Sequence, residues 1–118
     1  MIDAAIVGMG RWGRVLVESV QGKSEAIRFV AGCTRSPDKA ADWAKAQGIR
    51  MLDGYAAVLA DPAVKAVVLA TPHSQHAEQV IAAAAAGKQI FIEKPFTLTK
   101  ASAEQAVAAA RKAGVVMA

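Results

Sequence analysis

The sequence contains very few cysteines and aromatic residues, and it has no long apolar run. Cys33 is the only cysteine among 118 residues, so an internal disulfide is excluded. Hydrophobic residues make up 54 % of the chain, yet no run approaches the roughly 20 residues that span a bilayer. Asp3 interrupts the apolar start, and no basic segment of the kind that opens a signal peptide precedes it. We therefore expect a soluble, cytoplasmic protein without a membrane partner.

The charges are not gathered into runs of one sign. The formal net charge is +4, and lysines and arginines are spread along the chain. Aromatic residues, which could stack on bases, amount to 5 %. Because a nucleic-acid-binding protein usually carries a concentrated basic surface, no nucleic-acid partner is expected. A mild basic excess suits a protein that holds a phosphorylated small molecule.

Short apolar runs alternate with segments of helical spacing along the whole chain. Strands are predicted at 2–7, 26–33, 50–52, 66–71 and 89–93, and the beginning of a further strand at 115–118. Helices are predicted at 11–20, 36–48, 53–62, 73–87 and 99–113. In the first of them, Val15, Leu16, Ser19 and Val20 lie at helical spacing and suggest its buried face. Their end signals are Ser36 as an N-cap before Pro37, Thr99 as an N-cap, and glycines as stops at positions 22, 48, 87 and 114.

Two of the expected strands, around Val7 and around Leu69, are apolar on both faces. Strands of this kind are typical of a parallel sheet that helices cover on both sides. We therefore predict an α/β, Rossmann-type, doubly wound fold with a mostly parallel sheet, in a single domain over residues 1–118. Because the sequence ends in an expected strand, we also expect this domain to belong to a longer protein.

The stretch "AIVGMGRWGRV" contains Gly8, Gly10 and Gly13 in the spacing G-x-G-x-x-G. It follows an apolar strand and opens a helix, which is the context of a dinucleotide-binding turn. Gly8 would make the tight turn, Gly10 would let the backbone approach the pyrophosphate, and Gly13 would let the helix pack on the strand. The alternatives are a different nucleotide-like ligand or a plain turn without a ligand.

The residues after the second strand, "TRSPDK", favour NADP(H) over NAD(H). NAD-binding sites usually have Asp or Glu there to accept a hydrogen bond from the ribose 2′-hydroxyl, but this chain has Thr34 and Arg35. Arg35 would attract a 2′-phosphate, and Ser36 and Lys39 could add hydrogen bonds. Alternatively, Arg35 is a solvated turn residue and Ser36 only caps its helix, while Asp38 weakens the argument for NADP.

Three stretches together resemble the N-terminal domain of the Gfo/Idh/MocA oxidoreductase family, that of glucose–fructose oxidoreductase and inositol dehydrogenase. They are "AIVGMGRWG", "VVLATPHSQHAE" and "IFIEKPFTLT", which extend in order over essentially the whole chain. The E-K-P motif is the most specific of them. The resemblance implies hydride transfer between a nicotinamide cofactor and a carbinol or carbonyl of a sugar, cyclitol or related small molecule.

The resemblance also implies roles for residues at the ends of the fourth and fifth strands. Lys94, within Glu93-Lys94-Pro95, would be the catalytic lysine beside the nicotinamide, and it independently follows an apolar strand at the ligand-binding edge. An ammonium there could donate a proton to the reacting oxygen or polarise the carbonyl. The further cofactor contacts implied are Thr71, Pro72, His73, His76 and Glu93, although the family often has Asn where this chain has His73.

Several of these side chains have simpler interpretations. No third ligand of suitable spacing accompanies the two histidines, so no metal site is expected, and His76 contacts the cofactor or forms a local hydrogen bond. Arg11 and Trp12 could lie over the cofactor, or Arg11 could be solvated and Trp12 could pack against a partner domain. Trp43 is expected in the core, and Cys33 is expected to be a buried strand residue without a redox role.

The family resemblance implies a second domain, which would follow these 118 residues, complete the substrate pocket and form a homo-oligomer. We therefore expect this chain alone to bind cofactor without appreciable turnover. Two other functions remain open: a non-catalytic NAD(P)-binding sensor on the same fold, and a methyltransferase that binds S-adenosylmethionine. The methyltransferase would need an acid near Thr34 and Arg35, which the sequence lacks.

Overall fold

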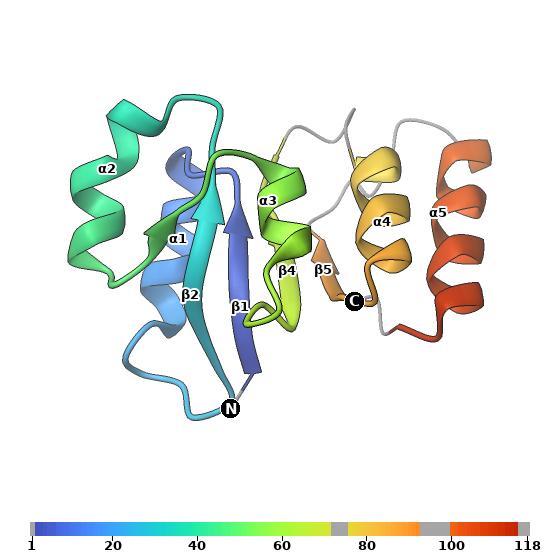
Figure 1. Cartoon of the computed structure of the whole chain (residues 1–118), viewed down its shortest axis with the longest axis horizontal. Helices are drawn as coiled ribbons and strands as arrows, with labels where there is room; N and C mark the ends of the chain where they lie inside the picture. The colour runs from blue at the N-terminus through green and yellow to red at the C-terminus, as the bar shows by residue number, and fades with distance from the viewer. Residues whose placement is uncertain (1, 72–75, 93–99, 116–118) are drawn as a thin grey trace.

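A computed structural model of the chain describes residues 2–71, 76–92 and 100–115 (Figure 1). Strands and helices alternate through these residues, as the sequence predicts. The expected strand at 115–118 lies almost entirely outside them. No helix of the described part combines the length and the apolar character needed to cross a membrane.

The five described strands form one parallel sheet. They are β1 (Ile2–Val7), β2 (Ile27–Cys33), β3 (Arg50–Met51), β4 (Ala66–Leu69) and β5 (Gln89–Ile92), in the spatial order β3-β2-β1-β4-β5. The order reverses direction at β1, whose two neighbours are β2 and β4. Ligands bind in open α/β sheets beside the carboxyl ends of the strands at such a reversal, so the candidate site lies there.

The helices begin and end close to the predicted positions. They are α1 (Arg11–Val20), α2 (Pro37–Ala46), α3 (Tyr55–Ala60), α4 (His76–Ala85) and α5 (Lys100–Ala113). Each of the four glycines predicted to stop a helix has a φ between 72° and 75°, the left-handed conformation that glycine adopts without strain. The expected helix starts at residues 73–75 and at Thr99 lie outside the described residues.

Helices cover both faces of the sheet, which confirms the doubly wound architecture (Figure 1). In β1, Ala5 and Val7 are buried on one face with residues of α3, α4 and α5. Ala4 and Ile6 are buried on the other face with residues of α1 and α2. Because the central strand is buried on both sides, its run of apolar residues is explained.

The buried face of α1 differs from the one that the sequence suggested. The helical spacing of Val15, Leu16, Ser19 and Val20 suggests that face. Leu16 and Val20 are half-buried and Val20 packs against the core, but Val15 and Ser19 are exposed, Val15 by 44 %. Gly13 and Val17, one helical turn apart, face the sheet instead. The helix approaches the β1–α1 turn closely at Gly13, and this contact decides which side of α1 is buried.

Trp43 was expected in the core, and this prediction is corrected. Ala40 and Ala44 of α2 are buried, whereas Trp43 is half-buried at the edge of the same cluster. Its indole N–H donates to a carboxylate oxygen of Glu18 at 3.0 Å. A tryptophan placed in this way keeps its polar atom within reach of a partner on α1.

We expect Val17→Ala to destabilise the protein by about 2 kcal/mol, because it removes fully buried methyl groups and leaves a cavity. Val15→Ala is the matched control on the same helix, and it should change the stability by less than about 0.5 kcal/mol. Urea unfolding of the two variants measures both values. Equal losses would contradict the assignment of the buried face.

Candidate dinucleotide site

Three polypeptide turns meet at the carboxyl edge of the sheet, beside the reversal at β1. They follow β1, β2 and β4, and they line a hollow of about 500 Å³. Its lining residues are Val7, Gly8, Met9, Gly10, Cys33, Thr34, Arg35, Gly54, Tyr55, Ala70, Thr71 and Gln79. The volume falls in the range of small-molecule and cofactor pockets.

Two glycines of the turn are required by the packing of the protein itself. Gly8 has a φ of 98°, and a Cβ atom there would lie 2.9 Å from the carbonyl oxygen of Ala70. A Cβ atom at Gly13 would overlap the carbonyl oxygen of Gly8. These two positions therefore need glycine whether or not a ligand binds.

Gly10 is different. Its backbone is extended, with a φ of −76° and a ψ of −171°, which any residue can adopt. A Cβ atom there would meet nothing within 4 Å. The packing of the described residues does not account for the missing side chain, but close approach of a ligand to this backbone would account for it.

The N-terminus of α1 faces the same region. Gly10 is the N-cap and has no side chain with which to cap the helix, and no acidic residue occurs in the first turn. The first amide groups of a helix lack intrahelical partners and carry partial positive charge. An anionic group such as a pyrophosphate could accept hydrogen bonds there.

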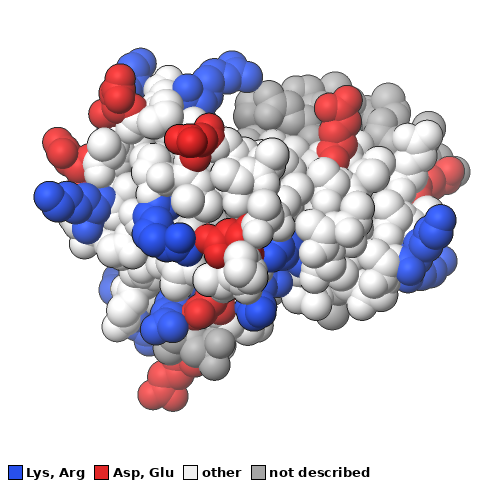
Figure 2. Space-filling view, viewed as in Figure 1, with Lys and Arg blue, Asp and Glu red and all other residues white. Residues whose placement is uncertain are grey.

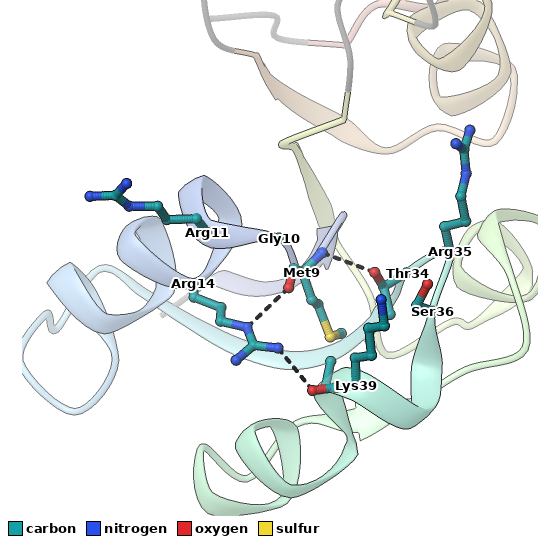
Figure 3. A pocket seen from close by; sticks show the side chains of 9 residues that line it. Met9, Gly10, Arg11, Arg14, Thr34, Arg35, Ser36 and Lys39 are labelled. Atoms are coloured by element: carbon teal, nitrogen blue, oxygen red, sulfur yellow. Dashed lines mark hydrogen bonds between the residues drawn. The ribbon is translucent and has the colours of Figure 1, made fainter.

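A second hollow of about 490 Å³ lies between the glycine turn and the start of α2 (Figure 3). It is lined by Met9, Gly10, Arg11, Arg14, Thr34, Arg35, Ser36, Lys39 and Ala40. Four of these side chains are basic and none is acidic. Neither salt bridge found among the described residues involves any of the four. This is the place where the sequence predicts that a 2′-phosphate binds.

The residues predicted around this second hollow have different environments. The Thr34 hydroxyl accepts a hydrogen bond from the Met9 amide at 3.3 Å and so joins β2 to the glycine turn. Ser36 is the N-cap residue of α2, but its side chain makes no capping hydrogen bond to the helix. The proposal that Ser36 serves only as a cap is therefore weakened, and its hydroxyl remains available for a ligand.

Three of the four basic side chains are exposed, those of Arg11, Arg35 and Lys39, and the first two extend away from Lys39 in Figure 3. Arg11 points outward from the start of α1, and Arg35 points toward the opposite side of the site. Arg35 lines both hollows, so it is placed between the region expected for the adenosine and that expected for the 2′-phosphate. Trp12 is 51 % exposed and lines neither hollow.

Arg14 is a basic residue that the sequence reasoning missed. Its Nε donates to the carbonyl oxygen of Met9, and its Nη2 donates to the carbonyl oxygen of Lys39, each at 3.0 Å. The guanidinium carbon lies 5.5 Å from the centre of the Trp43 ring. Lys39 and Trp43 lie 25 or more residues further along the chain, so no local sequence pattern could reveal these two contacts.

The turn after β4 is held by hydrogen bonds from α4. The Thr71 hydroxyl donates to Oε1 of Gln79 at 2.5 Å, and Nε2 of His76 lies 2.8 Å from the Thr71 carbonyl oxygen. His76 is buried, with 3 % of its surface exposed. Of its two predicted roles, the structure shows the local hydrogen bond. Pro72, His73, Glu93 and Lys94 lie outside the described residues.

Tyr55 and Gln79 also line the first hollow, although the sequence analysis did not single them out. The Tyr55 hydroxyl donates to the backbone oxygen of Gln79 at 2.6 Å. Burial is the main cause that raises the pKa of Tyr55 above its usual value, and the nearby Cys33 raises it further. Tyr55 is therefore a neutral hydrogen-bond donor that fixes α4 against α3.

Cys33 is buried at the end of β2, as predicted. Burial raises the pKa of its thiol to about 11, so the reactive thiolate is disfavoured at neutral pH. In the described ranges, no group of three or more His, Cys, Asp or Glu side chains is arranged to hold a metal ion.

Three features together define a dinucleotide-binding Rossmann domain. They are a parallel sheet whose strand order reverses at β1, the glycine turn after β1, and the open backbone at Gly10. Sequence comparison agrees: residues 2–118 match the family model of the Gfo/Idh/MocA oxidoreductases, described as an oxidoreductase family with an NAD-binding Rossmann fold. The chain belongs to this family, and it forms the NAD(P)-binding domain.

Two curated proteins of similar sequence illustrate the functions of the chain's relatives. Scyllo-inositol 2-dehydrogenase (NAD(+)) of Bacillus subtilis strain 168 is 37 % identical over 119 residues, which cover 98 % of this chain and 34 % of that protein. For 1,5-anhydro-D-fructose reductase of Ensifer adhaerens, the identity is 34 % and the coverages are 92 % and 35 %. The chain thus spans about a third of the length of these relatives.

Among solved structures, biliverdin reductase from Synechocystis sp. PCC 6803, in complex with biliverdin and NADP+, superposes with a TM-score of 0.89. Its sequence identity is 28 %, and the match covers 98 % of this chain and 36 % of that one. The similar proteins therefore include one named for NAD(+) and one solved with NADP+. Similarity to them is compatible with either cofactor.

Alanine substitutions should distinguish Gly13, which the fold requires, from Gly10, which it does not. We expect Gly13→Ala to destabilise the protein by more than about 2 kcal/mol, because the added methyl group overlaps the Gly8 carbonyl inside a packed region. Gly10→Ala, the matched control, should change the stability by less than about 0.5 kcal/mol. Thermal unfolding without nucleotide measures both. A large loss for Gly10→Ala would show that its glycine serves the fold and not a ligand.

Proposed function

We propose that the chain binds NADP(H) in preference to NAD(H), as the cofactor domain of an oxidoreductase. The observation that carries the preference is the second hollow, beside the end of β2, whose lining contains four basic side chains and no acidic one. An acid at this place would accept a hydrogen bond from a ribose 2′-hydroxyl and repel a 2′-phosphate. Basic side chains attract the 2′-phosphate, which carries the additional charge of NADP.

The parts of the site fit the parts of the cofactor. The open backbone at Gly10 and the N-terminus of α1 suit the pyrophosphate, and the Ser36 hydroxyl and Lys39 suit the 2′-phosphate. Arg35 lies between the two hollows, where its planar guanidinium can stack on an adenine ring and also reach the phosphate. Thr71 also lines the first hollow and follows β4, on the other side of β1 from β2, where the nicotinamide is expected.

Arg35→Ala should weaken NADP binding about tenfold and NAD binding much less, because only NADP loses a charge-assisted hydrogen bond. Gly10→Ala should weaken both nucleotides, since both share the pyrophosphate. The control is Arg111→Ala, at an exposed position near the end of α5. Calorimetric titration with NADP and NAD measures the affinities. Equal losses for Arg35→Ala, or tighter NAD binding by the unmutated chain, would overturn the preference.

The reaction we propose is hydride transfer between the cofactor and a carbinol or carbonyl of a sugar, cyclitol or related small molecule. Bound NADP(H) supplies or accepts the hydride. Lys94 comes two residues after the end of β5 in the sequence, so we expect it near the same carboxyl edge as the glycine turn. Its ammonium would donate a proton to the reacting oxygen during carbonyl reduction, and its amine would accept one during alcohol oxidation.

Lys94→Ala should lower the turnover of the complete enzyme by about 10²- to 10⁴-fold, the usual contribution of a general acid or base, while NADP affinity stays within about threefold. The measurement combines steady-state oxidation of cyclitols and sugars with NADP titration. Lys112→Ala, at an exposed position on α5, is the control. Unchanged turnover in Lys94→Ala would refute the catalytic role of Lys94, whereas absence of turnover in the unmutated complete protein would favour the sensor alternative.

The remaining expectations concern the whole protein. We propose that residues 1–118 are its cofactor domain and that the relatives' additional length corresponds to a domain that completes the substrate pocket and forms a homo-oligomer. In that arrangement the chain alone binds cofactor without appreciable turnover. The charges on the face shown in Figure 2 are interspersed, with both signs present, and they form no continuous basic surface there.

A further inference from the structure

We propose that Arg14 is the positioning residue that builds the 2′-phosphate hollow and thereby sets the selectivity for NADP over NAD. The inference rests on the proposed function, because it concerns the same hollow. It goes beyond the basic residues that follow β2, since Arg14 belongs to α1 and its partners belong to other segments. It assigns the selectivity in part to the geometry between the two walls of the hollow.

Arg14 joins these two walls directly. One wall is the glycine turn, where the Met9 carbonyl oxygen accepts from Nε at 3.0 Å. The other is the first turn of α2, where the Lys39 carbonyl oxygen accepts from Nη2 at 3.0 Å (Figure 3). Because one rigid guanidinium binds both carbonyl groups, it fixes the distance between the walls.

The guanidinium is itself held by an aromatic platform. Its central carbon lies 5.5 Å from the centre of the Trp43 ring, within the range of a cation–π contact. Trp43 is in turn anchored by its indole N–H, which donates to Glu18 at 3.0 Å. Glu18 is one turn after Arg14 on α1, so the three side chains form a closed connection between α1 and α2.

This connection distinguishes Arg14 from the other cations of the hollow. Arg11, Arg35 and Lys39 are exposed, whereas Arg14 is half-buried and its position is fixed. Exposed long side chains lose rotamer entropy when they bind a phosphate, but a side chain that is already held loses little. Arg14 thus contributes a preorganised positive charge, and it also places the start of α2, from which Ser36 and Lys39 project.

Lysine cannot replace this arginine in the proposed role. Arginine presents five N–H donors in a planar fork, whereas the lysine ammonium is a compact charge that cannot bind both carbonyl groups in the same way and lie flat on the tryptophan. Arg14→Lys therefore keeps the charge of the hollow and removes its geometry. Trp43→Leu removes the platform without changing any charge that lines the hollow.

The test isolates the 2′-phosphate by comparing adenosine 2′,5′-bisphosphate with 5′-AMP, and NADP with NAD, in calorimetric titrations. We expect Arg14→Lys to lower the affinity for the 2′-phosphorylated member of each pair about tenfold and that for its partner less than threefold, a loss equivalent to one charge-assisted hydrogen bond. Trp43→Leu should shift the ratios in the same direction by a smaller factor.

Arg111→Lys, at an exposed position on α5, is the matched control and should leave all four affinities unchanged. Circular dichroism and thermal unfolding show whether each variant is folded. If Arg14→Lys does not fold, the ratios measured in Trp43→Leu decide. Unchanged ratios, or equal losses for both members of each pair, would overturn the proposal and leave Arg14 with a purely structural role.

A failure of the role proposed for Arg14 can be distinguished from a failure of the proposed function. If the unmutated chain binds neither NADP nor NAD, or prefers NAD, the proposed function itself fails. If Arg35→Ala shifts the NADP/NAD ratio and both Arg14→Lys and Trp43→Leu do not, the NADP preference stands and only the role of Arg14 is refuted.

Discussion

The close approach of α1 to the end of β1 is the constraint on which the rest of the site depends. At Gly13 the helix packs so tightly against the Gly8 carbonyl that a methyl group has no room. This contact directs the N-terminus of α1 to the carboxyl edge of the sheet, beside the reversal of strand order. It also turns Val17 toward the sheet and Arg14 toward α2, so the same contact orients a core residue and a basic residue of the second hollow.

The two hollows differ in the chemical groups that line them. The first is built from turn backbone, with Thr71, Tyr55 and Gln79 fixed by hydrogen bonds among themselves. The second is cationic and is closed by the connection between α1 and α2. In the proposed function one ligand fills both hollows: a dinucleotide whose pyrophosphate lies at the centre and whose additional phosphate lies near one end.

Much of the fold could be predicted because its signals are local. The alternation of apolar runs, the pair Ser36-Pro37 and the four helix-stopping glycines placed most elements within a few residues. The buried face of α1 could not be predicted from apolar residues alone, because the contact at Gly13 overrides them. The predicted core position of Trp43 was wrong because its indole N–H has a hydrogen-bond partner on another helix, which no local pattern reveals.

By itself, the sequence determined the fold class, the family and the residue types available at the site, because periodicity, turn residues and motifs are readable within short windows. The tertiary structure decided why each glycine is there, since only packing distinguishes Gly13, which the fold requires, from Gly10, which it does not. It also decided the place of Arg14. Hydrogen bonds between residues 25 positions apart exist only after β1 and β2 have paired and brought α1 against α2.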